Sequence, residues 1–156
     1  MLTRSLKVFN TGWTGLPPVS VSGTDDVPGA TRTFNITANG TSYELTELLI
    51  QWSAKPDGSF QQRYRQNPKT PVVTIPAAQG GYSYHGYWAT LKGQQTLVPN
   101  ETSILYNVYR CDIGVPFNTA PAHESSIANI SSILSKEGEL TGVSITPFST
   151  LSLVAG

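Results

Sequence analysis

Residues 29–52, GATRTFNITANGTSYELTELLIQW, predict two β-strands joined by a tight turn. Residues 30–36 and 43–51 alternate in the manner of strand side chains, which repeat with a period of two. Asn39 and Gly40 lie between them. Asn-Gly is the strongest short-range hairpin signal, because both central residues of a type I′ turn need positive φ. We therefore expect an antiparallel hairpin with one half-buried face.

Each arm of this hairpin carries one charged side chain among apolar ones. Arg32 shares its face with Phe34 and Ile36, and Glu47 shares its face with Leu45. A charge on an otherwise apolar face is costly unless it is paired or functional. The pattern therefore indicates a lined cavity rather than a dry core.

The composition predicts one domain spanning residues 1–156. Lys plus Arg and Asp plus Glu each number 10, charged residues make up 13%, and no basic patch is visible, so nucleic acid is not an expected partner. No apolar run approaches the roughly 18 residues of a membrane span. Because the chain has one cysteine, two histidines and no cofactor-binding motif, we expect neither a metal site nor a tightly held cofactor.

The sequence leaves the cellular location open. Sequons of the N-x-S/T type, which mildly favour a secreted glycoprotein, occur at Asn35, Asn39, Asn100 and Asn129. The N-terminus MLTRSLKVFNTGW has no signal-peptide pattern, because its longest apolar run is two residues. Secretion and a cytoplasmic location therefore stay equal alternatives. Each sequon is expected on an outward face or a loop, and Asn35 lies on the face opposite Arg32.

The remaining pattern predicts a helix, then further strands, then a second helix. Helical spacing indicates a short helix at 2–10 and a longer one at 122–136. The inner stripe of the longer helix consists of His123, Ile127, Ile130 and Leu134. Further strands are expected at 60–66, 72–75, 82–91 and 102–113. A bulge near Gly86 would shift the register of its strand, and the tail at 137–156 is weakly patterned.

The order of these elements and motifs resembles the START-like helix-grip superfamily. The most specific parts are Gly-Ala-Thr-Arg at 29–32 and Thr-Glu-Leu-Leu at 46–49, followed by Tyr-x-Gly-x-Trp at 84–88. The resemblance covers about residues 2–136. That superfamily includes polyketide cyclases and dehydrases, lipid carriers and other SRPBCC-type proteins, some of them in secondary metabolism.

This resemblance implies an α+β fold, in which a curved antiparallel β-sheet grips a C-terminal α-helix around an internal cavity. The family normally begins with a strand before its first helix, and this sequence has no counterpart to it. A truncated or processed N-terminus is one explanation. The sheet edge would then be left open, to be filled by the tail or by a second copy in a homodimer.

The resemblance and the strand alternation together select the candidate site residues. The catalytic candidates are Glu47 as general acid or base, His123 as a second base and Arg32 as a donor to a ligand oxygen. A structural ion pair between neighbouring strands is the alternative for Arg32 and Glu47. The candidates for ligand binding are Tyr84, Trp88, Tyr106, Arg110, Phe34 and Ile127.

Two functions compete at this stage, and both use a small hydrophobic molecule as the partner. The first is a cofactor-independent cyclase, isomerase or dehydratase that acts on a polyketide or terpenoid intermediate. The second is a carrier or sensor that binds a lipophile without changing it, and a purely structural secreted protein is a third alternative. The polar residues of the predicted cavity favour the enzyme, because a carrier tolerates an almost wholly apolar pocket.

Overall fold

The computed structural model describes residues 9–10, 12–38, 40–70, 73–79, 81–113, 119–140, 142 and 147–150. Its two short 3₁₀ helices are η1 (Gly12–Thr14) and η2 (Ala77–Gln79). Its one α-helix among these ranges is α1 (Ala120–Lys136). The strands are β1 (Ser20–Ser22), β2 (Thr31–Ala38), β3 (Thr41–Ala54), β4 (Phe60–Gln66), β5 (Val73–Ile75), β6 (Tyr82–Gln95) and β7 (Thr102–Ile113).

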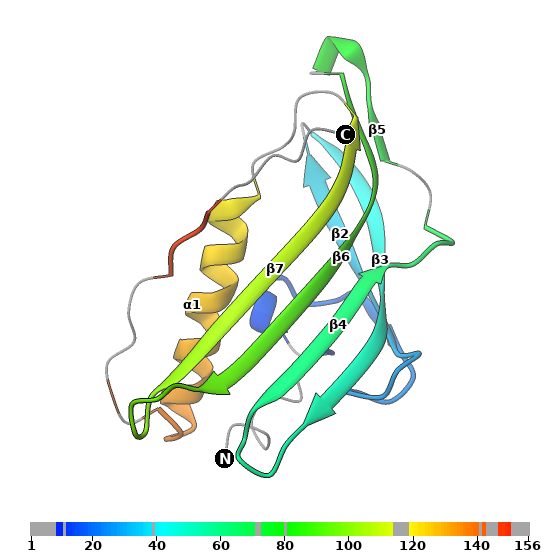
Figure 1. Ribbon diagram of the computed structural model, residues 1–156. Coiled ribbons are helices and arrows are strands. Elements are labelled where there is room, and N and C mark those ends of the chain that lie inside the picture. Colours follow the sequence, from blue (N-terminus) through cyan, green and yellow to red (C-terminus); the bar gives the residue numbers. More distant parts are fainter. Residues whose placement is uncertain are drawn as a thin grey trace.

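The seven strands form one antiparallel sheet, which curves around α1 (Figure 1). Strands β1 to β4 follow one another across the sheet, and β4 is hydrogen-bonded to β6. On its other edge β6 pairs with β7 along most of its length, while β5 pairs with the first residues of β6. This architecture is the α+β helix-grip fold that the sequence predicts.

Most element boundaries agree with the sequence predictions. The hairpin is formed by β2 and β3, with Gly40 at φ 78°, and Asn39 lies outside the described residues. The helix predicted at 2–10 also falls outside them, apart from its last two residues. The edge of β2 is not bare, because the short strand β1 pairs with it. Asn35 is exposed, in agreement with the inward assignment of Arg32.

Two hydrophobic clusters fill the space between the sheet and α1. The first combines Trp13 of η1 with Phe60 and Leu91 of the sheet and with Ile130 and Leu134 of α1. The second lies under the hairpin and is made of Phe9, Ala30, Leu45, Leu49, Tyr64, Tyr87 and Ala89. Phe9 and Trp13 therefore bring the N-terminal part of the described chain into the interior, where η1 lies between α1 and the strands (Figure 1).

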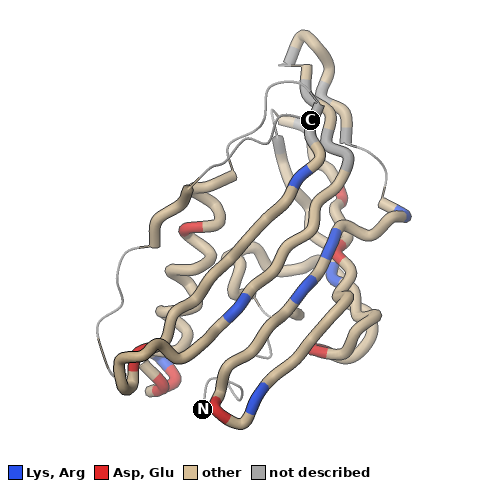
Figure 2. The backbone as a smooth tube through the Cα atoms, viewed as in Figure 1, with Lys and Arg blue, Asp and Glu red and all other residues tan. Residues whose placement is uncertain are grey.

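Charged residues are sparse along the described chain, and Figure 2 shows positions of both signs distributed over the backbone in that view. Within the same ranges, no helix is both long enough and apolar enough to cross a membrane. The one cysteine, Cys111, is exposed on β7. The unusual charges of this protein are accordingly the ones that lie inside it.

The first cluster depends on a close approach between β4 and β6 at Gly93. Gly93 pairs directly with Phe60, whose ring stacks on Trp52 at a centroid distance of 5.7 Å. A Cβ at position 93 would lie 2.9 Å from Cδ1 of Phe60 and closer still to Cε1. Only glycine leaves room for the ring at this position.

We predict that Gly93→Ala lowers the free energy of unfolding by about 1–3 kcal/mol, the usual cost of overpacking a core. Chemical denaturation followed by far-UV circular dichroism measures the change. Gly12→Ala is the matched control, because a Cβ there meets no atom within 4 Å. Adding Phe60→Leu to Gly93→Ala should restore part of the loss, and equal stability of Gly93→Ala and wild type would contradict this packing.

Candidate functional site

The centre of the interior is an ion pair between the two arms of the hairpin. Arg32 and Glu47 are direct cross-strand partners, and they are only 0% and 6% exposed. Arg32 Nε donates to Glu47 Oε2 at 2.5 Å, and Arg32 Nη1 donates to the backbone carbonyl of Phe9 at 2.6 Å. The Tyr87 hydroxyl donates to the other oxygen of Glu47. Both carboxylate oxygens of Glu47 therefore accept a hydrogen bond.

Aromatic rings surround the guanidinium group of Arg32. Its central carbon lies 4.6 Å from the ring centroid of Phe9, 5.0 Å from that of Tyr64 and 5.2 Å from that of Phe34. Trp13 completes this aromatic box at 5.7 Å. A cation over several ring faces gains electrostatic attraction in a desolvated site. Arg32 is thus packed by the protein's own side chains and does not line an open space here.

Burial and charge act in opposite directions on the two members of the pair. Burial raises the pKa of Glu47, and the attraction of Arg32 only partly opposes that rise. Burial also disfavours the charge of Arg32, but Glu47 and the nearby tyrosines hold the pKa of Arg32 above its ordinary value. Arg32 therefore stays a cation, while Glu47 takes up a proton more readily than an exposed glutamate.

A second chain of titratable groups runs from the sheet to α1. The hydroxyls of Tyr64 and Tyr106 lie 2.6 Å apart, and burial raises the pKa of both. The ring of Tyr106 meets that of His123 edge-on at 5.0 Å. Burial and then Arg110 lower the pKa of His123. The His123 imidazole is therefore neutral near pH 7 and able to accept a proton.

The remaining predicted site residues occupy different places. Arg110 on β7 is the cross-strand partner of Tyr87 on β6, and its Nη1 donates to the hydroxyl of Thr119 at 2.9 Å. Phe34 is buried in the aromatic box, and Ile127 packs on the first hydrophobic cluster. The side chain of Tyr84 lies outside the described part of the structure.

The inward placement of Trp88 is wrong. Trp88 is 44% exposed on the outer face, and its neighbour Tyr87 points inward instead. The cause is a register shift between Tyr84 and Tyr87, where Gly86 has φ 125° and forms a bulge. A one-residue slip moves every later side chain to the opposite face. A second shift, between Leu49 and Gln51, likewise exposes Gln51, whereas unbroken alternation after Glu47 and Leu49 would turn it inward.

Several residues near the ion pair were missed by sequence reasoning. Phe9 and Trp13 come from the N-terminal segment, which the alternation of strands says nothing about. Gln62, Tyr64 and Gln66 form the inner face of β4, where every second residue is buried. The sequence FQQRYRQ carries that alternation, but its glutamines do not distinguish the inner face from the outer one.

Unpartnered polar atoms accompany the ion pair. Among the described residues, buried side-chain atoms with no hydrogen-bond partner include Arg32 Nη2, Trp13 Nε1, Gln66 Oε1 and both amide atoms of Gln62. A buried polar group that lacks a partner destabilises the fold by about 1–3 kcal/mol. Groups of this kind call for an explanation such as a ligand or an ordered water.

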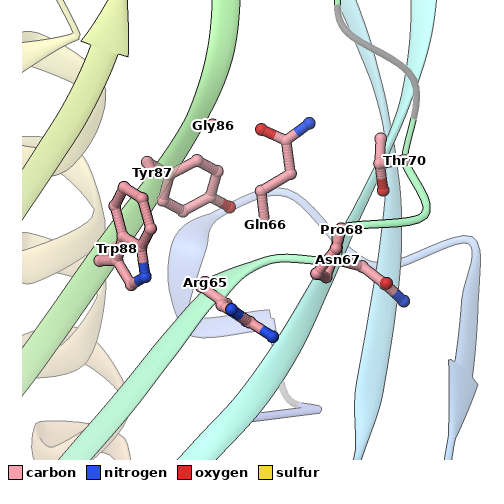
Figure 3. A pocket seen from close by; sticks show the side chains of 8 residues that line it. All are labelled: Arg65, Gln66, Asn67, Pro68, Thr70, Gly86, Tyr87 and Trp88. Atoms are coloured by element: carbon pink, nitrogen blue, oxygen red, sulfur yellow. The ribbon is translucent and has the colours of Figure 1, made fainter.

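A pocket of about 270 Å³ opens beside this polar interior, where β4 ends next to β6 (Figure 3). Its lining residues are Arg65, Gln66, Asn67, Pro68, Thr70, Gly86, Tyr87 and Trp88. Tyr87 connects it to the ion pair, since the hydroxyl of Tyr87 donates to Glu47. No three His, Cys, Asp or Glu side chains within the described ranges are grouped so as to hold a metal ion.

Comparisons with known proteins agree with this architecture. A protein-family model described as START domain matches residues 5–155, which is nearly the whole chain. Searches of curated proteins and of solved structures found no match. The predicted relationship to the START-like superfamily is thereby confirmed. The chain belongs to the START domain family, whose fold is one for binding hydrophobic ligands.

Proposed function

We propose that this START domain binds a small lipophilic molecule next to Glu47 and catalyses a cofactor-independent proton transfer on it. The reaction class is a cyclisation, isomerisation or dehydration of a polyketide or terpenoid intermediate. The observation that carries the proposal is the buried, proton-accepting Glu47, held between Arg32 and the Tyr87 hydroxyl. An acid whose pKa is shifted by burial and by a specific charge partner is a candidate for catalytic function.

A buried ion pair such as Arg32–Glu47 is not expected to make a large net contribution to the stability of the fold. Moving each ion out of water costs several kcal/mol, and well-packed apolar residues of similar volume are often neutral or stabilising replacements. Here the pair brings a further penalty, because Arg32 Nη2 stays without a partner among the described residues. A costly polar cluster of this kind is expected where function requires it.

The proposed roles follow from the contacts of each group. Glu47 in its carboxylate form takes a proton from a carbon next to a ligand carbonyl, and it returns the proton elsewhere on the ligand. Arg32 has one unpartnered N–H group, at Nη2, which can donate to the oxygen that gains negative charge. Tyr87 holds the carboxylate in place through its hydroxyl. An isomerisation by this route uses only proton transfer and hydrogen bonding.

The chain formed by Tyr64, Tyr106 and His123 supplies, in this proposal, a second group that can take up or release a proton. His123 is neutral near pH 7, so its imidazole is free to accept a proton from the ligand during the reaction, and burial and the charge of Arg110 favour release of that proton. Tyr106 contacts His123 through its ring and Tyr64 through its hydroxyl, so it links the face of α1 to the aromatic box. The raised pKa of Glu47 and the lowered pKa of His123 bring the proton affinities of the two groups closer together, so that either group is suited to donate or accept a proton.

Binding without chemistry is the second candidate, and one observation favours it. Arg32 Nη1 already donates to the backbone carbonyl of Phe9, and both oxygens of Glu47 already accept hydrogen bonds. These groups are therefore already engaged within the protein. A carrier needs such groups only to orient a polar end of the ligand. The two candidates differ in one measurable respect, which is whether Glu47 moves a proton on the bound molecule.

Proton transfer by Glu47 predicts deuterium exchange. Wild-type protein in heavy water should incorporate deuterium next to the carbonyl of lipophilic ketones and enones, as followed by mass spectrometry. Glu47→Gln keeps the shape of the side chain and should slow this exchange by about 10²–10⁴-fold. Glu44→Gln is the control, because Glu44 is an exposed acid on the same strand. Exchange in Glu47→Gln within about threefold of wild type would exclude Glu47 as the base, and binding of these ketones without exchange would support the carrier.

The argument about stability predicts a non-additive double mutant. Arg32→Met and Glu47→Leu should each lower the free energy of unfolding by about 3–5 kcal/mol, because each leaves one buried charge unpaired. The double variant should be more stable than either single variant. A double variant as unstable as the sum of the two singles would show that the pair does not interact in this way. Urea denaturation of the four proteins at one pH gives the comparison.

The lowered pKa of His123 predicts a pH dependence of stability. The folded protein favours neutral His123, whereas the unfolded chain takes up the proton below its ordinary pKa of about 6.5. The free energy of unfolding should therefore fall as the pH decreases from about 7 to about 5. His123→Phe keeps an aromatic ring against Tyr106 and should fall less over this window. Parallel pH profiles of the two proteins, each of which retains His85, would contradict the lowered pKa.

A further inference from the structure

The sheet has an opening between β4 and β6. The two strands pair only as far as Arg65 and Trp88, beyond which the chain leaves β4 and turns toward β5. The bulge at Gly86 lies directly across this point. The 270 Å³ pocket occupies the opening, with Gln66 and Tyr87 from the inner face and Arg65 and Trp88 from the outer face (Figure 3).

The wall of this opening is fixed by hydrogen bonds to β3. The backbone N–H of Asn67 donates to the carbonyl of Thr46 at 2.7 Å, and the hydroxyl of Thr70 donates to the same carbonyl at 3.4 Å. The backbone N–H of Thr70 donates to the carbonyl of Asn67 at 2.8 Å. This wall is therefore a fixed turn fastened to the neighbouring strand, as a preformed small-molecule site requires.

The side-chain oxygen of Gln66 is a hydrogen-bond acceptor without a donor in the described structure. The residue is 8% exposed, and its Oε1 is buried without a partner. A Cβ at Gly86 would lie 3.5 Å from this oxygen, so the amide faces the bulge and the pocket. Gln66 is also the direct cross-strand partner of Glu47. A ligand hydroxyl or N–H in the pocket would satisfy this buried acceptor.

Arg65 and Trp88 define the other two requirements of the ligand. The Nε of Arg65 is buried and has no partner among the described residues, so it calls for an acceptor, and its positive charge favours an anion. Trp88 leaves 44% of its surface exposed on the outer face, which is an unusual position for an indole ring. A planar ring can stack there, and the pocket volume suits a molecule with one ring.

We propose that the opening between β4 and β6 is a binding site for a single-ring aromatic acid that also carries a hydroxyl group. The carboxylate accepts from Arg65, the hydroxyl donates to Gln66 Oε1, and the ring lies against Trp88. This site goes beyond the proposed function, because it is reached from the outer face and does not depend on proton transfer by Glu47. Tyr87 lies between it and the ion pair.

The test uses meta- and para-hydroxybenzoate as probes of the full chain. Titration followed by NMR should shift the indole N–H resonance of Trp88 more than those of the other two tryptophans. Benzoate and phenol each lack one of the two polar groups, and each should bind roughly tenfold more weakly than the better hydroxybenzoate, which is the usual effect of losing one hydrogen bond.

Matched variants separate the pocket from general surface effects. Arg65→Met, Gln66→Met and Trp88→Leu should each weaken binding by roughly tenfold. Arg63→Met is the control for charge, because Arg63 is an exposed arginine two positions along β4. Tyr109→Leu is the control for an exposed ring, because Tyr109 pairs with Trp88 on the same face. Both controls should bind as wild type does.

Two results would overturn the proposal. One is the absence of any Trp88 shift at millimolar hydroxybenzoate in folded protein. The other is equal binding by wild type, Arg65→Met and Trp88→Leu, which change outward-facing residues and so test the site even where Gln66→Met fails to fold. Binding that persists in Glu47→Gln, whose deuterium exchange is measured separately, would show that this site stands independently of the catalytic proposal.

Discussion

The interior of this protein is organised around one buried ion pair, Arg32 with Glu47. An isolated ion in an apolar interior costs several kcal/mol, so each charge must be surrounded by compensating groups. The protein supplies them from distant parts of the chain: a backbone carbonyl at Phe9, a hydroxyl at Tyr87 and the faces of four aromatic rings. The hairpin brings the two charges together, and groups from the rest of the fold offset the free-energy cost of burying them.

This requirement explains why the N-terminal segment lies between the sheet and α1. Phe9 and Trp13 cover the guanidinium group, and Trp13 also belongs to the hydrophobic cluster shared with α1. The hydroxyl of Ser126 on α1 donates to the backbone carbonyl of Thr14 at 3.0 Å, which fastens η1 to the helix. The segment therefore links the ion pair to α1. Any ligand that approaches Arg32 from the helix side has to share this space with Phe9 and Trp13.

Strand alternation predicted much of the fold, and it failed where the alternation itself breaks. The hairpin, β4, β7 and α1 follow from period-two and helical patterns, and the Arg32–Glu47 pair follows from the hairpin register. The bulge at Gly86 exchanges Trp88 for Tyr87 on the inner face, and no local pattern fixes on which side of a glycine a register shift begins. The aromatic box was not predictable either, because Phe9 and Trp13 meet Arg32 only through tertiary packing, which leaves no periodic signal in the sequence.

The same bulge gives the buried acid a connection to the outer face. Arg32, Glu47 and Gln66 are successive cross-strand partners on β2, β3 and β4, so they form one polar row across the inner face. Beyond Gln66 the row reaches Gly86, where β4 and β6 no longer pair and the pocket opens. Tyr87 takes part on both sides, because it lines the pocket and donates its hydroxyl to Glu47. A Cβ at Gly86 would lie in van der Waals contact with Gln66 Oε1, at 3.5 Å, so the glycine whose bulge turns Trp88 outward also lies directly at the end of this row.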